Sequence, residues 1–229
     1  KIKSISPIID GSSGSMDDFF ELLKQHLLQL NLKDASEITF CADGGNGIWS
    51  RVDHLVNELG IHNAKRILDY THAKQNLGII TELICETLKL PDKESGKLSK
   101  QILELLWNGD INGIVDIVQE RLSSRKKSLK AALKKLGNYF KDHSKFQYRM
   151  FREKGLPTGS GTVESAIRRV INLRVKGAGM FWKRENAEKM IFLRSIVLTG
   201  KLKTACHKAL GIVKEMFVND VLNDLSLAA

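Results

Sequence analysis

Two aspartates in the first third of the chain each follow a short apolar run and precede a helix-like pattern. Asp43 follows residues 38–42 (ITFCA), and Asp69 follows Ile67 and Leu68. An acid placed where a strand ends and a helix begins lies at the carboxyl edge of a sheet, where open α/β folds bind their ligands. The sequence therefore predicts an acidic site at this edge.

Asp43 opens the glycine-rich run 43–47 (DGGNG). Glycines let the backbone turn sharply and leave a neighbouring carboxylate uncovered, which favours a functional role for Asp43. The alternative is an aspartate that only caps the following helix. The run lacks the spacing of a GxGxxG dinucleotide-binding motif and the later acids of a calcium-binding loop.

Asp69 and His72 form an Asp-x-x-His motif at the second junction between strand and helix. Both residues are candidates for the catalytic site. The alternative is that Asp69 is a helix N-cap and His72 a first-turn residue without a chemical role. A zinc site is disfavoured because no second His or Cys lies at ligand spacing.

Glu164 follows a Gly-Ser-Gly loop and falls in the first turn of a predicted helix. Its alternative role is a favourable interaction with the helix dipole and an ion pair with Arg168 one turn later. Four cations follow it closely: Arg168, Arg169, Arg174 and Lys176. An acid beside such a cationic strip is typical of a metal-binding carboxylate next to bound phosphates.

The net charge of +10 is concentrated in two blocks of the chain. Residues 121–152, which include Lys126, Lys127 and Lys130, carry eleven Lys and Arg against one acid. Residues 165–184 carry six Lys and Arg and no acid. Such blocks attract a polyanion, most simply a nucleic acid, and the alternative is a solvated helix face. Trp182 could stack on a base, although burial in the core is the favoured interpretation.

The hydrophobic pattern predicts alternating strands and helices first, and then helices alone. The expected elements are strands over 1–9, 38–42 and 67–68, helices over 15–30, 46–59 and 70–90, a polar break over 91–97, helices across 98–151, 162–174 and 183–198, and two short helices at the end. The alternation indicates an α/β fold with a partly parallel sheet covered by helices.

Other features exclude whole classes of protein. No apolar run reaches the roughly 18 residues that a membrane span needs, and no signal-peptide pattern opens the chain. Cys41, Cys85 and Cys206 make no CxxC pair, so we expect reduced thiols in a cytoplasmic protein with no membrane partner.

Three blocks of the sequence resemble DDE-type transposases of bacterial insertion sequences, in particular the ISKra-like branch. They are Ala42-Asp43-Gly44 with Ile48-Trp49, then residues 68–73 (LDYTHA), then residues 159–165 (GSGTVES), with a further match over 172–182. The blocks occur in the family's order, and the resemblance covers roughly residues 1 to 200.

The resemblance implies a partial RNase H-like fold, with an all-α insertion and C-terminal helices. The implied parts are residues 1–90 with the second acid, a helical insertion over 91–157, a return to the core over 158–200 with the third acid, and a helical tail over 201–229.

The resemblance also implies DNA cleavage and strand transfer by two Mg²⁺ or Mn²⁺ ions held by three acids. By position Asp43 matches the second acid and Glu164 the third, while Asp69 and His72 match a motif near the catalytic site. The first acid is expected upstream of Lys1, because Asp10 lies in a loop and is not accepted in its place. This chain alone is therefore expected to be inactive.

The implied partners are the ends of the insertion sequence, target DNA and further copies of the protein, in the bacterial nucleoid. Two alternatives stay open. One is a resolvase-type nuclease of the same fold, which would cut DNA without joining it. The other is a non-catalytic DNA-binding or assembly module left from a decayed element.

Overall fold

The computed structural model describes residues 7–30, 32, 35–45 and 47–212. Its elements are α1 (Met16–Leu28), β1 (Ile38–Ala42), α2 (Ile48–Glu58), β2 (Ala64–Leu68), α3 (Tyr70–Leu88), α4 (Asp92–Asn108), α5 (Ile111–Leu122), α6 (Lys126–Tyr139), the 3₁₀ helix η2 (His143–Phe146), α7 (Tyr148–Glu153), α8 (Gly161–Ile167), the π-helical turn η3 (Arg168–Asn172) and α9 (Arg184–Leu198). Residues 202–212 are helical as well. The chain divides into two compact units, residues 26–162 and residues 1–25 with 163–229.

The larger unit contains a small parallel sheet of two strands. Ile38 of β1 lies opposite Ala64 of β2, and Ala42 lies opposite Leu68. Both predicted strands are confirmed, and β2 begins three residues earlier than its apolar pattern indicates. The polar start of β2 carries Lys65 and Arg66, whose side chains form ion pairs with Glu37 and Asp53. A mostly helical chain with a parallel sheet fits the α/β class, and the RNase H-like fold stays a prediction.

The strand expected over residues 1–9 is not found in the part that the structure describes. Residues 1–6 lie outside the described residues, and residues 7–9 are not in a strand. The helix α2, which connects β1 to β2, buries Val52, Leu55 and Val56, as its hydrophobic pattern predicts.

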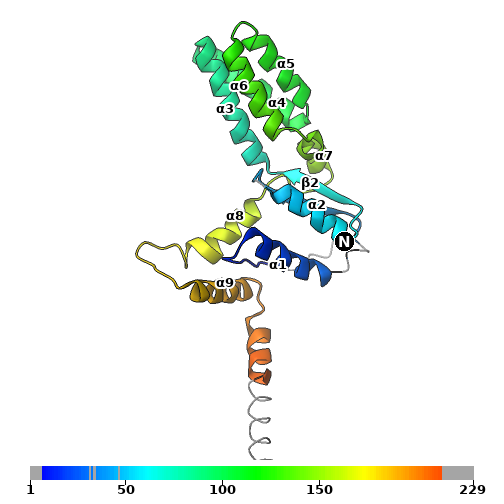
Figure 1. Cartoon of the computed structure of the whole chain (residues 1–229), viewed down its shortest axis with the longest axis vertical. Helices are drawn as coiled ribbons and strands as arrows, with labels where there is room; N and C mark the ends of the chain where they lie inside the picture. The colour runs from blue at the N-terminus through cyan, green and yellow to red at the C-terminus, as the bar shows by residue number, and fades with distance from the viewer. Residues whose placement is uncertain (1–6, 31, 33–34, 46, 213–229) are drawn as a thin grey trace, which may run out of the picture. The chain divides into compact units, whose positions relative to one another are not determined.

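Helices α3, α4, α5 and α6 form an antiparallel bundle (Figure 1). Each helix packs on the next along the chain, and α6 returns to pack on α3. The helices predicted across 98–151 are confirmed, and their role as an insertion stays a prediction. The polar break predicted over 91–97 is wrong because α4 begins at Asp92. Pro91 occupies the N-cap, and Asp92 and Glu94 lie in the first turn, where acids interact favourably with the helix dipole. Polar residues here start a helix.

One hydrophobic core joins helices α3 to α7 to the sheet. Ile67 and Leu68 of β2 belong to the same buried cluster as the aromatic side chains after α6, which are Phe140, Phe146, Tyr148 and Phe151. The Tyr148 hydroxyl also donates a hydrogen bond of 2.9 Å to the Leu68 carbonyl. The compact unit therefore extends across the boundary expected at residue 90, because the strands and the inserted helices share apolar contacts.

The smaller unit contains most of α1 and α8, together with η3 and α9. Ser15 and Asp18 cap α1 reciprocally: Ser15 N–H donates to the Asp18 carboxylate at 2.7 Å, and Asp18 N–H donates to Ser15 Oγ at 3.2 Å. Glu188 of α9 accepts hydrogen bonds from Ser12 Oγ and Ser13 N–H. These bonds join the segment before α1 to α9.

Candidate active site

Asp43 lies directly after β1, at the carboxyl edge of the sheet. Its Oδ1 accepts a hydrogen bond of 3.0 Å from the Gly45 N–H, which stabilises the turn within the glycine-rich run. Gly47, with φ of 78°, occupies the N-cap of α2, so Asp43 does not cap that helix. The Oδ2 of Asp43 accepts no hydrogen bond from a described residue, which leaves this oxygen available to a ligand.

The Tyr139 side chain, from the C-terminal end of α6, packs against the turn that carries Asp43. A Cβ atom at Gly44 would lie 2.5 Å from Cε2 of Tyr139, so only glycine permits this approach. Burial raises the pKa of Tyr139 to about 12; the nearby Asn76 side chain opposes this shift, and the charges of Asp43 and Asp69 add to it. Tyr139 therefore stays a neutral phenol next to the acidic edge. No local pattern in the sequence indicates this contact.

Asp69 is 1% exposed and has hydrogen bonds on both carboxylate oxygens. Its Oδ1 accepts the His72 N–H at 2.9 Å, so the N-cap alternative is confirmed. Its Oδ2 accepts the Ser160 hydroxyl at 2.7 Å and also the Ser160 N–H. Burial acts to raise the pKa of Asp69, but the hydrogen bonds from Ser160 and His72 outweigh it and lower the pKa from 3.8 to about 2. Asp69 is therefore an ionised, buried carboxylate.

His72 lies beside this carboxylate in the first turn of α3. Its Nδ1 is 3.2 Å from Oδ1 of Asp69. Since Asp69 uses both of its oxygens within the protein, its geometry suits a positioning residue better than a metal ligand. A catalytic role for Asp69 or His72 stays a prediction.

Three distant segments meet at this edge of the sheet. The Asp69 N–H donates to the Ala42 carbonyl at 2.8 Å, which joins the ends of β2 and β1. The Tyr70 N–H donates to the Thr158 carbonyl at 2.9 Å, beside the bonds between Asp69 and Ser160. The Asp43 turn, the start of α3 and the Gly-Ser-Gly loop thus surround one place. Sequence reasoning identified the loop but missed the role of Ser160.

Glu164 lies in the first turn of α8 and belongs to the smaller unit. Its side chain is exposed and forms no ion pair with a described residue, so the pairing with Arg168 considered as its alternative role is not made. Its convergence with Asp43 stays a prediction.

The predicted DNA-binding cations are exposed in both units. Lys126, Lys127 and Lys130 lie on α6. A shallow hollow of about 590 Å³ on this helix is lined by Lys126, Leu129, Lys130, Leu133 and Lys134. In the smaller unit the predicted cations Arg168, Arg169, Arg174 and Lys176 are exposed as well. The interpretation of Trp182 as a core residue is wrong, because 38% of its surface is exposed in a loop before α9.

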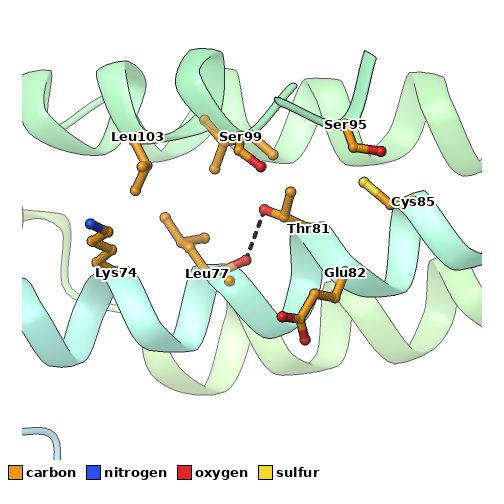
Figure 2. Close-up of a pocket in the computed structure, with 10 residues that line it drawn as sticks. Lys74, Leu77, Thr81, Glu82, Cys85, Ser95, Ser99 and Leu103 are labelled. Atoms are coloured by element: carbon orange, nitrogen blue, oxygen red, sulfur yellow. Dashed lines mark hydrogen bonds between the residues drawn. The ribbon is translucent and has the colours of Figure 1, made fainter. Parts of the chain in front are cut away.

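A separate pocket of about 350 Å³ lies between α3 and α4 (Figure 2). Apolar side chains such as Leu77 and Leu103 form much of its lining, and the Lys74 side chain also faces it, whereas the Glu82 carboxylate points away from it. The Thr81 hydroxyl donates a hydrogen bond of 2.9 Å to the Leu77 carbonyl. None of the site residues predicted from the sequence lines this pocket, so the sheet edge is the candidate active site.

Comparisons with known proteins do not assign a function to this site. Comparison of the chain with protein-family models, with curated proteins and with solved structures found no match. Within the described ranges, no three His, Cys, Asp or Glu side chains gather closely enough to hold a metal ion. No described helix combines the length and the apolar character that crossing a membrane requires.

Proposed function

We propose that this chain is the C-terminal catalytic portion of a DDE-type DNA transposase of an insertion sequence. The observation that carries the proposal is the link between Asp69 and Ser160, two residues 91 positions apart. It brings together two of the blocks that resemble this family, and the bond from Asp69 to Ala42 adds the third. The helical insertion lies between them in the sequence, as the family resemblance implies.

Asp43 and Glu164 are the proposed metal-binding acids. Asp43 fits this role because its Oδ2 has no hydrogen bond from a described residue, and Glu164 fits because its side chain is exposed without an ion pair to a described residue. Bound Mg²⁺ or Mn²⁺ would activate a water or a DNA 3′-hydroxyl and stabilise the leaving oxygen of the phosphodiester. The glycine turn presents Asp43, and Tyr139 packs against that turn.

The exposed cations of the two basic blocks would hold the DNA backbone. Lys126, Lys127 and Lys130 form one group, and the arginines that follow Glu164 form the other. Contacts of this kind position a duplex without reading its sequence. Nucleoid localisation and assembly with further copies on the DNA ends belong to this proposal.

The test compares Asp43→Asn and Glu164→Gln in the complete protein with two control variants. The controls Asp116→Asn and Glu104→Gln remove exposed acids on α5 and α4. We expect both site variants to fold normally and to lose DNA cleavage and joining, while the controls keep both activities. If a site variant joined DNA as well as the unmodified protein does, the replaced residue would not be part of the active site. Cleavage without joining by the unmodified protein would favour a resolvase-type nuclease.

A further inference from the structure

Three consecutive apolar side chains are exposed in the loop between η3 and α9. Phe181 is 97% exposed, Met180 48% and Trp182 38%, and together they are called the apolar tip here. Folding alone does not favour a Phe in water, because burial of such a side chain is worth roughly 1.5–3 kcal/mol. A solvent-facing Phe with apolar neighbours on both sides therefore indicates a binding surface.

The loop that carries the apolar tip has a defined turn. The Met180 N–H donates to the Gly177 carbonyl at 3.1 Å. Gly179 adopts φ of 74°, which favours glycine, and a Cβ atom at Gly177 would lie 2.9 Å from the Met180 sulfur. The positive φ thus makes Gly179 necessary for the turn that precedes Phe181, whereas the flexible Met180 side chain can move aside for a Cβ atom at Gly177.

Cations flank the apolar tip on both sides in the sequence. Arg174 and Lys176 precede it, Lys183 and Arg184 follow it, all four are exposed, and residues 173–184 contain no acid. Such a field attracts a polyanion. An aromatic ring among phosphate-binding cations is the combination with which proteins bind unpaired nucleotides, because each base offers a flat face for stacking.

We propose that the apolar tip is a binding site for an unpaired DNA base, with the Phe181 ring stacked on the base and the four flanking cations on the neighbouring phosphates. Bases inside a duplex cover each other's faces, so the ring can stack only at a bulge, a frayed end or a single strand. The inference rests on the proposed function for its choice of DNA as the polyanion.

The experiment measures binding of the full chain to three labelled DNAs of equal length. These are a perfect duplex, the same duplex with a central bulge of unpaired bases, and a single strand. The variants are Phe181→Ala, Phe181→Trp and the matched control Phe192→Ala, which removes another exposed Phe, 61% exposed, from α9 of the same unit. Circular dichroism establishes that each variant is folded.

Stacking on one base is worth about 1–3 kcal/mol, so Phe181→Ala should weaken binding to the bulged and single-stranded DNA by roughly 5- to 150-fold. Binding to the perfect duplex should change by less than about 2-fold, because backbone contacts dominate there. Phe181→Trp should restore the preference for unpaired bases and quench a 2-aminopurine placed in the bulge. Phe192→Ala should behave as the unmodified chain.

Three outcomes would overturn the inference. Equal weakening on all three DNAs would mean that Phe181 supports the fold or the backbone contacts. If Phe181→Ala bound all three DNAs with unchanged affinity and steep salt dependence, Phe181 would not stack on a base, and the proposed function would be unaffected. Loss of binding to phosphatidylserine vesicles in Phe181→Ala, with DNA binding intact, would assign the tip to a membrane surface.

Discussion

Ser160 donates to the same carboxylate oxygen of Asp69, Oδ2, from both its hydroxyl and its backbone N–H. The acceptor is almost fully buried, and the two residues are 91 positions apart in the sequence. Hydrogen bonds to an ionised acceptor are about twice as strong as neutral ones. This pair therefore fixes the Gly-Ser-Gly loop against the start of α3.

Replacing Ser160 with Ala should lower the free energy of unfolding by about 1.5–3 kcal/mol, because it removes the 2.7 Å hydroxyl bond to a buried charge. The measurement is urea unfolding followed by circular dichroism. Ser124→Ala, at an exposed turn position in the same unit, is the control and should change this free energy by less than about 0.5 kcal/mol. Equal midpoints for the two variants would contradict this role of Ser160.

Acid should destabilise the protein partly through Asp69. The pKa of this carboxyl is about 2 in the folded state against 3.8 for an unperturbed group, so its contribution is present above about pH 4 and is lost as the pH falls towards 2. The difference corresponds to about 2 kcal/mol. Urea unfolding of the unmodified protein and of Asp69→Asn, from about pH 5 to pH 2, measures it. The gap in stability between them should shrink with acid, and a constant gap would refute the assignment.

Replacing Gly44 with Ala should destabilise the larger unit by about 1–3 kcal/mol, because its Cβ would meet the Tyr139 ring at 2.5 Å. Gly137→Ala is the matched control, since a Cβ atom there meets nothing within 4 Å and the position lies within α6. The control should stabilise by about 0.5–1 kcal/mol. If the clash is the cause, the cost of Gly44→Ala should fall in a Tyr139→Ala background. An unchanged cost there would mean that the ring is not responsible.

The two basic blocks should contribute separately to the salt dependence of DNA binding. Replacing Lys126, Lys127 and Lys130 with Gln should reduce the slope of log affinity against log salt by about 1 for each lysine that binds a phosphate. Arg168→Gln with Arg169→Gln should do the same in the smaller unit. A triple Gln variant of the exposed Lys93, Lys97 and Lys100 on α4 is the control and should leave the slope unchanged. If all three variants had the same slope of log affinity against log salt, neither basic block would be the surface that binds the DNA phosphates.

Sequence patterns predicted those features that depend only on residues close together in the chain. The apolar run of β1, the N-cap role considered for Asp69 and the buried stripe of α2 all follow from short-range periodicity and capping. The start of α4 was missed because its first turn is polar. The contacts of Asp69 with Ser160 and of Gly44 with Tyr139 could not be predicted, since each joins segments that only the packed helices bring together.

Because β2 and helices α4 to α7 share one hydrophobic core, these helices cannot be removed without exposing apolar side chains of β2. Excising residues 91–157 would remove Phe146, Tyr148 and Phe151, and with them the apolar cover of Ile67 and Leu68. The Leu68 carbonyl would also lose its bond from Tyr148. A shortened version would leave one side of β2 with exposed apolar side chains, so we expect it to aggregate.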